Sequence, residues 1–298
     1  MTTMQETQPQ NRTIVRPNRP MGLRATRAAF TALELVAPGL GAGWAVRLWC
    51  TVPRGAAHRQ DNRPRPGTLS TVAVPSGRSV VVESWGSGPP VYLVHGWGGW
   101  RGQLGAFADP LLARGYRVVA FDAPSHGASA PGRLGPRRST LAEFSDALRA
   151  VVAEHGQPAG VIGHSLGCTA TAVAVRDGLR TPRLGFVAPS VQPLAATRQM
   201  AAALGFSERT RSAMIRRLEA LVGRPMSDFD LLALADRGHL PPTLVVHDRD
   251  DKEVAHDEAD RLVATWPQAD LVSTEGLGHH RILRAAEVVA LVALFVGP

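Results

Sequence analysis

The sequence predicts an α/β fold in which a mostly parallel, doubly wound sheet carries a short helical insertion. From residue 69 onward, short apolar runs with strand character alternate with longer stretches of helical period, as in parallel sheets with helices on both faces. One such strand leads into the helix after it through Gly163-His164-Ser165-Leu166-Gly167, a Gly-x-Ser-x-Gly pattern typical of a sharp strand-to-helix turn. About fifty residues between 190 and 240 show only helical patterns, which indicates the insertion.

Length and composition suit one large α/β domain with a modest insertion. The chain has 298 residues, and 44% of them are hydrophobic, which is enough for a sizeable core. Only 19% are charged, too few for a disordered protein. The net charge of +8 is uneven, because residues 1–66 carry +7 and the rest of the chain only +1. No recognition motif accompanies this charge, so we expect no nucleic-acid partner.

The chain is predicted to divide into a basic N-terminal arm, residues 1–66, and a main domain, residues 67–298. Residues 1–23 are polar with scattered Pro and Arg and are expected to be disordered. Residues 54–66 are again rich in Pro and Arg and are interpreted as a linker. We therefore expect the functional chemistry to lie in the main domain.

An apolar segment, residues 28–52, lies within the arm. Glu34, Pro38 and Arg47 interrupt it, so it matches neither a transmembrane helix nor a signal peptide. It is interpreted as an amphipathic segment that packs on the main domain and breaks near Pro38. Its Arg-rich flank leaves open a peripheral contact with a membrane surface.

The main domain is expected to contain eight strands, the first two of which can form an antiparallel edge. The strands are predicted at 69–74, 79–85, 91–94, 116–121, 160–162, 184–188, 242–246 and 269–273. Helices are predicted at 103–114, 140–155, 166–177, 193–204, 208–222, 228–235, 256–265 and 285–296. The three helices between 193 and 235 are interpreted as a cap, about 191–240, over the carboxyl ends of the strands, where open α/β sheets bind ligands.

The turn around Ser165 is expected to be strained and crowded. A side chain at Gly163 or Gly167 would collide with the neighbouring strand or helix, which is a physical reason for glycine at both positions. Such a turn presents the serine hydroxyl at the top of the sheet. Ser165 is therefore a candidate nucleophile.

Four separated motifs resemble those of the α/β-hydrolase family, and they come in the family's order. They are His95-Gly96-Trp97-Gly98-Gly99, the turn around Ser165, the Asp-rich loop after residue 246, and Gly276-Leu277-Gly278-His279. The resemblance covers about residues 69–298. It implies the α/β-hydrolase fold and a catalytic triad in the chain order serine, acid, histidine.

Sequence order restricts the acid. No Asp or Glu lies between Asp177 and Glu208, so the strand between them cannot supply it. The next acidic loop offers Asp248, Asp250 and Asp251. Similarity to the family's His-Gly-x-x-Asp loop implies that Asp251 is the acid, with the other two as alternatives.

A serine hydroxyl is a poor nucleophile until a base removes its proton, so a histidine is required. His279 and His280 follow the last expected strand, in a loop that contains Gly276 and Gly278. The glycine pattern favours His279 as the base, and His280 is interpreted as a neighbour or wall residue.

Negative charge that develops on a substrate oxygen needs fixed hydrogen-bond donors. The backbone N–H of Leu166 lies at a helix N-terminus and is one candidate for this oxyanion hole. The backbone N–H of Trp97, in the loop after His95-Gly96, is the second. The side chains of Trp97 and His164 are predicted to contact the substrate.

The sequence indicates no metal and no cofactor. Its two cysteines, Cys50 and Cys168, lack metal-ligand spacing and do not suggest a disulfide framework. Cys168 is interpreted as a small core residue. A reducing, cytoplasmic location is expected, with association at a membrane surface left open.

The resemblance implies a serine esterase that cleaves small or medium, fairly apolar carboxylic esters through an acyl-enzyme. Thioesterases, C–C hydrolases, cofactor-free haloperoxidases and acyltransferases use the same residues and stay open, as does a non-catalytic hydrolase-like binding protein. The serine at position 165 argues against haloalkane dehalogenases and epoxide hydrolases, which resemble this fold but attack with a carboxylate. The cap also lacks tyrosine.

Overall fold

The computed structural model describes residues 21–53, 61–75, 78–234 and 240–297. Several expectations therefore lie wholly or partly outside the described residues. They are most of the disorder predicted over 1–23, the first part of the Pro/Arg linker, the turn at 76–77 and the end of the helix predicted to reach 235. Residues 21–23, also predicted to be disordered, are instead helical.

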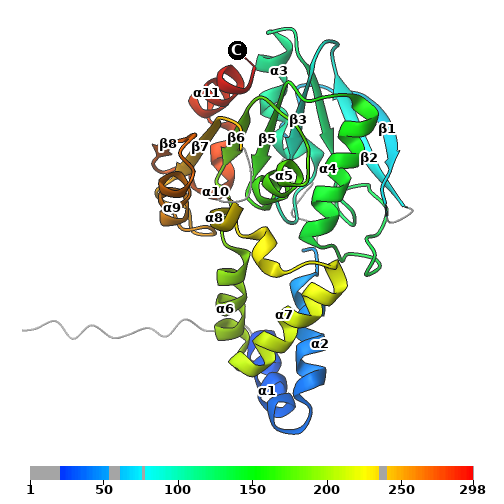
Figure 1. Cartoon of the computed structure of the whole chain (residues 1–298), viewed down its shortest axis with the longest axis vertical. Coiled ribbons are helices and arrows are strands. Elements are labelled where there is room, and N and C mark those ends of the chain that lie inside the picture. The colour runs from blue at the N-terminus through cyan, green and yellow to red at the C-terminus, as the bar shows by residue number, and fades with distance from the viewer. Residues whose placement is uncertain (1–20, 54–60, 76–77, 235–239, 298) are drawn as a thin grey trace, which may run out of the picture.

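One sheet of eight strands forms the centre of the described chain (Figure 1). The strand order is β1-β2-β4-β3-β5-β6-β7-β8. β1 and β2 pair antiparallel with each other, β2 pairs antiparallel with β4, and all other neighbours pair in parallel. The strands are β1 (Thr68–Ala73), β2 (Ser79–Trp85), β3 (Pro90–Val94), β4 (Arg117–Phe121), β5 (Gly160–His164), β6 (Leu184–Val187), β7 (Thr243–Asp248) and β8 (Ala269–Thr274). This confirms the predicted α/β class and its antiparallel edge.

Helices cover both faces of the sheet, which makes it doubly wound. Residues of α4 (Leu141–His155), α5 (Leu166–Arg176) and α9 (Asp257–Thr265) share one buried apolar cluster with one face. Residues of α3 (Ala108–Leu112) and α11 (Ala286–Val296) share a second cluster with the other face. The start of α4 is fixed by a capping box between Thr140 and Glu143.

The segment predicted as one helix over 103–114 is divided into η2 (Arg101–Phe107), a 3₁₀ helix, and α3. Gly105 lies within η2, where a Cβ would be 2.5 Å from the backbone nitrogen of Arg63. Gly105 thus permits the segment before β1 to pass directly over η2. Two short elements after β8 are absent from the expected set, α10 (Gly278–Arg281) and η5 (Ile282–Arg284).

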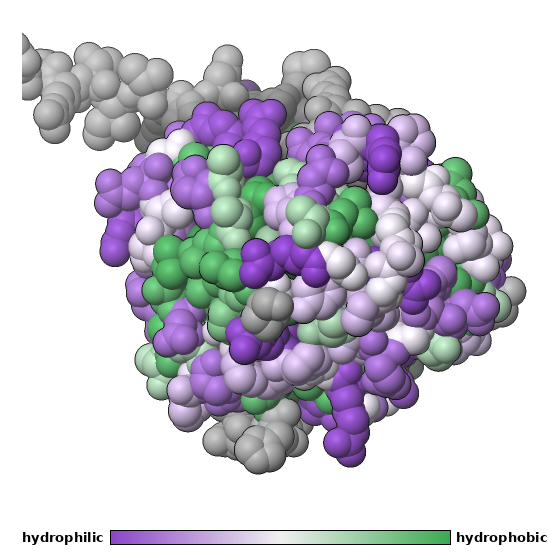
Figure 2. All heavy atoms as spheres, turned by 90° about the horizontal axis from the view of Figure 1, so that it is seen from above, coloured by the Kyte–Doolittle hydropathy of each residue, from purple (hydrophilic) through white to green (hydrophobic). Residues whose placement is uncertain are grey.

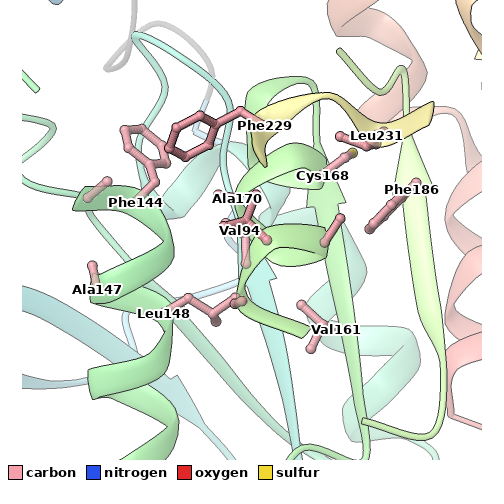
Figure 3. Packing of buried hydrophobic residues seen from close by; sticks show 14 of the residues in the cluster. Val94, Phe144, Ala147, Leu148, Val161, Cys168, Ala170, Phe186, Phe229 and Leu231 are labelled. Atoms are coloured by element: carbon pink, nitrogen blue, oxygen red, sulfur yellow. The ribbon is translucent and has the colours of Figure 1, made fainter. Parts of the chain in front are cut away.

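The cap contains α6 (Pro193–Leu204) and α7 (Glu208–Val222), at the predicted bounds. The third expected helix is instead η3 (Met226–Phe229) followed by α8 (Leu231–Leu234). Asp230 separates them in an extended conformation, and its carboxylate accepts the N–H of Leu232 at 3.0 Å. Figure 3 shows Phe229 and Leu231, on either side of this break, projecting toward buried residues of α4, α5 and β6.

The apolar segment of the arm forms a helical hairpin, α1 (Met21–Val36) and α2 (Pro38–Trp49). Proline at the first position of α2 suits a helix start and separates the two helices. α1 packs against α6, and α2 packs against α7 (Figure 1). The buried ring of Phe30 stacks on Trp44, with centroids 4.3 Å apart, and also contacts Phe206 at 4.9 Å. Across the described residues, no helix is both long and apolar enough to span a bilayer.

Candidate active site

Ser165 lies in the sharp turn between β5 and α5, with φ 52° and ψ −121°. This is a strained backbone conformation for a residue with a side chain. A Cβ at Gly163 would lie 2.9 Å from the Cα of Cys168. A Cβ at Gly167 would lie 2.3 Å from the carbonyl oxygen of Val94 on β3. The predicted crowding on both sides of the serine is therefore confirmed.

A histidine and a carboxylate meet beside this turn. His279, in α10 after β8, is joined through Nδ1 to the Oδ2 of Asp251, in the loop after β7, at 2.7 Å. The Asp251 side chain is fully buried and its Oδ2 is also 3.2 Å from His247 Nε2. Its Oδ1 accepts the backbone N–H groups of Glu253 at 2.8 Å and Val254 at 3.0 Å. Burial alone raises the pKa of Asp251, but these hydrogen bonds outweigh it and hold that pKa far below its usual range.

Asp248 and Asp250, the two alternative acids, contact the loop that carries His279 but not the His279 ring. Asp248 accepts the hydroxyl of Thr274 at 2.7 Å and the backbone N–H of Leu277 at 3.0 Å. Asp250 accepts the backbone N–H of Gly276 at 2.9 Å. Of the three candidates, Asp251 is the one in contact with the imidazole.

His164 was predicted to contact the substrate, but its side chain is buried away from the cavity. Its ring is 1% exposed and is not among the residues that line the cavity described below. Its Nε2 lies 2.9 Å from the backbone carbonyl oxygen of His279, and because a carbonyl only accepts, Nε2 donates. Burial lowers the pKa of His164 well below its usual value, which keeps the ring neutral. His164 therefore does not line the cavity as predicted, and its ring instead donates to the backbone of His279.

The His164 bond places His279 next to the serine turn, since His164 immediately precedes Ser165. The rings of His164 and His279 have centroids 4.7 Å apart. Among the described residues, no hydrogen bond joins the Ser165 hydroxyl to His279, whose Nε2 lies 3.9 Å from a carboxylate oxygen of Glu253. Catalytic hydrogen bonds are often long in a substrate-free enzyme and shorten when substrate binds.

The loop after β3 passes directly over the serine turn. A Cβ at Gly96 would lie 2.9 Å from the Cβ of Ser165. In the described part of the chain, the backbone N–H groups of Trp97 and Leu166 have no hydrogen-bond partner, and both residues line the same cavity as Ser165. Two free donors beside a serine are what an oxyanion hole requires.

Two buried histidines hold this loop in place, a feature that the sequence reasoning missed. His126 Nε2 accepts the backbone N–H of Gly98 at 3.1 Å. His95 Nε2 accepts the N–H of Ala123 at 3.0 Å, and its Nδ1 donates to the carbonyl of Gly96 at 2.7 Å. Burial lowers the pKa of His95 to about 4 and that of His126 to about 3, so both rings are neutral acceptors. The sequence signal for this role was that both histidines follow directly after strands, β3 and β4, whose carboxyl ends lie at the same edge of the sheet.

A cavity of about 590 Å³ opens beside Ser165. Its walls come from four parts of the chain. The serine turn with the loop after β3 is one, and residues 139–142 at the start of α4 are another. The cap contributes residues such as Met200 and Phe229, and the N-terminal hairpin contributes Leu48 and Trp49. This contribution of the hairpin segment to the cavity was not predicted from the sequence. Its apolar period indicated a packed segment but could not show that the packing partner was the cap.

Both cysteines are free and buried. Cys168 is fully enclosed in the core, as expected for a small packing residue. Within the described ranges, no group of three or more His, Cys, Asp or Glu side chains is arranged to hold a metal ion.

The fold and the position of the serine turn define the class as an α/β hydrolase. The chain belongs to the alpha/beta hydrolase family, whose model matches residues 91–291. The chain is similar to a non-heme haloperoxidase of Rhodococcus erythropolis, with 37% identity over 32% of this chain and 34% of the relative. It is also similar to a pimeloyl-[acyl-carrier protein] methyl ester esterase of Chromobacterium violaceum, with 37% identity over 30% of this chain and 32% of the relative. Each match thus spans about a third of the relative's length.

A hydrolase from Pseudomonas aeruginosa is similar in three dimensions, with a TM-score of 0.59 and 25% identity. The match covers 78% of this chain and all of that structure.

Proposed function

We propose that this protein is a serine hydrolase that cleaves carboxylic esters, with Ser165 as nucleophile, His279 as base and Asp251 as the orienting acid. The observation that carries the proposal is the 2.7 Å contact between His279 Nδ1 and the buried Asp251 carboxylate, next to a serine in a strained turn. The methyl ester esterase among the relatives supports ester cleavage, while the non-heme haloperoxidase keeps the cofactor-free haloperoxidase reaction as the second candidate.

In the proposed reaction, Oγ of Ser165 attacks the ester carbonyl carbon while its proton moves to Nε2 of His279. The carbonyl oxygen becomes an oxyanion and accepts the backbone N–H groups of Trp97 and Leu166. The bond between the carbonyl carbon and the alcohol oxygen then breaks, and His279 gives the proton to the departing alcohol. A water molecule then attacks the carbonyl carbon of the acyl-serine while His279 takes one of its protons. The bond between that carbon and Oγ breaks, His279 returns the proton to Ser165, and the carboxylic acid leaves.

Asp251 keeps its negative charge throughout this cycle. Its low pKa means that it stays ionised when His279 becomes protonated, so it stabilises the imidazolium without taking the proton. Because Nδ1 of the neutral His279 ring donates its proton to Oδ2 of Asp251, Nε2 is left unprotonated. The carboxylate therefore selects the tautomer that can act as base.

The cavity supports a small or medium acyl or alcohol group of apolar character. Its volume falls in the range of small-molecule sites. Apolar side chains from the cap and the hairpin, including Leu48, Met200 and Phe229, line it together with Ser165.

A panel of p-nitrophenyl esters of increasing acyl length, with thioesters of the same acyl groups, tests this proposal. We expect measurable ester hydrolysis that rises from acetate to medium-length chains. Ser165→Ala should lower kcat by about 10³-fold or more while the protein stays folded. A folded wild-type protein that leaves every ester intact would contradict the proposal, and cleavage of the thioesters alone would favour the thioesterase alternative.

A further inference from the structure

The turn between α1 and α2 exposes three large apolar side chains to solvent. Leu35 is 83% exposed, Val36 is 80% exposed and Leu40 is 69% exposed, the highest values among the large hydrophobic residues described. Figure 1 shows this turn at the end of the molecule farthest from the sheet. We call Leu35, Val36 and Leu40 the hairpin tip.

The hairpin does not need these three side chains for its own packing. Its contact with the cap is made by the buried Phe30, stacked on Trp44 and against Phe206. Arg27 adds hydrogen bonds from its guanidinium to the carbonyl oxygens of Ala202 and Ala203 at the end of α6. The hairpin is therefore held in place from one side, while its tip presents apolar surface with no partner in the described chain.

Exposed arginines of α7 lie beside the tip. The guanidinium of Arg217 lies against the start of α2, where its Nη2 would be 3.7 Å from a Cβ at Gly39. Arg209 is close to Glu34. The Glu34 carboxylate is itself engaged by the backbone N–H and hydroxyl of Ser207. Arg209 interacts electrostatically with Glu34, and Arg217 makes no ion pair with another described residue. Both side chains are exposed, so both guanidinium groups can also reach an outside partner.

We propose that the hairpin tip docks this protein on a bilayer that contains anionic phospholipid. Apolar side chains at a helix turn can enter the headgroup region, while adjacent arginines pair with lipid phosphates. No described helix is long and apolar enough to cross the bilayer, so the contact is peripheral. The docking does not depend on the hydrolytic function proposed above.

The test is sedimentation of the full-length protein with vesicles of phosphatidylcholine, either alone or with about 30% phosphatidylglycerol. The tip variant combines Leu35→Asp, Val36→Asp and Leu40→Asp, three exposed positions where folding should be unaffected. Circular dichroism and thermal melting check that it folds. The matched control is Leu294→Asp on α11, another exposed leucine at 52%. Figure 2 views the end of the molecule opposite the tip, where hydrophobic residues also gather among polar ones.

We expect the wild-type protein and the Leu294→Asp variant to sediment with the anionic vesicles, and both to stay in solution with the neutral ones. The tip variant should lose about tenfold or more in vesicle affinity. Arg209→Gln should weaken binding, and higher salt should do the same, because the lipid charge is screened.

Three results would overturn the proposal. The wild-type protein could stay in solution with both kinds of vesicle, or the tip variant could bind as the wild type does. The wild-type protein could also form dimers that the tip variant lacks, without binding vesicles, which would assign the tip to self-association. Hydrolysis of a soluble short-chain ester by the tip variant is a separate readout, so failure of the catalytic proposal is distinguishable from failure of this one.

Discussion

Replacing Asp251 by Asn removes the charge at the centre of the proposed triad and keeps the side-chain shape. In the wild type, the carboxylate contacts two imidazoles through Oδ2 and accepts two backbone N–H groups through Oδ1. The amide has one oxygen and one NH₂ group. If the amide oxygen keeps the two backbone hydrogen bonds, the NH₂ group faces Nδ1 of His279. Nδ1 must then accept a hydrogen bond, so the ring proton moves to Nε2.

That tautomer cannot accept the proton of Ser165, so the loss should be large. For a triad with its acid replaced by the amide, a fall of about 10⁴-fold in kcat is expected, which corresponds to about 5 kcal/mol of transition-state stabilisation. The same change also turns the new NH₂ group toward the Nε2–H of buried His247, which donates to the carbonyl oxygen of Val254. Two donors then face each other, which should destabilise the fold by roughly 1–3 kcal/mol. Esterase kinetics must therefore be compared at a temperature where urea titration shows both proteins to be folded.

The matched control is Asp250→Asn, one position earlier in the same loop. That carboxylate accepts the N–H of Gly276 and does not contact His279, so activity should change less than tenfold. A folded Asp251→Asn variant with kcat/KM within tenfold of the wild type would refute the reasoning. An equal loss in the two variants would also refute it, because it would point to loop geometry rather than to the contact with the imidazole.

Three further predictions concern the turn, the neutral histidines and the cavity. Gly167→Ala should destabilise the protein by roughly 2–4 kcal/mol in urea titrations, because the new Cβ meets backbone oxygen at 2.3 Å; Gly22→Ala, where nothing lies within 4 Å, should be close to neutral. His95 and His126 have folded pKa values of about 4 and about 3, below 6.5, so the unfolded chain takes up protons first and stability should fall as pH drops from about 6.5 to about 4. The slope should be on the order of 1 kcal/mol per pH unit for each ring, and a stability that is flat over this range would contradict the burial argument. Leu48→Trp should lower kcat/KM for medium-chain esters more than for acetate, and an equal effect on both would show that α2 does not limit the substrate.

Much of the site could be predicted because local sterics determine it. The serine turn requires glycine where β3 and α5 approach it, and Gly163 and Gly167 signal that requirement in the sequence itself. The cap helices α6 and α7 were also predictable, since Pro193 suits a helix start and Gly205 and Gly223 follow their last turns in the left-handed conformation.

What the sequence could not show depends on contacts between distant segments. The apolar period of residues 28–52 predicts a buried face, but only the fold reveals that the face lies on α6 and α7 and lines the cavity. The break at Asp230 depends on whether its carboxylate caps α8 or faces solvent, which no local pattern decides. His164 was expected to contact substrate because it adjoins Ser165, whereas burial and the carbonyl of His279 turn it inward.

Labelling with a serine-directed fluorophosphonate, followed by mass spectrometry of peptides, shows whether Ser165 is an activated nucleophile. We expect one adduct on the peptide that contains Ser165, none in Ser165→Ala, and much slower labelling in Asp251→Asn. A folded wild-type protein that takes up no label, or takes it up at another residue, would contradict the assignment of Ser165 as an activated nucleophile.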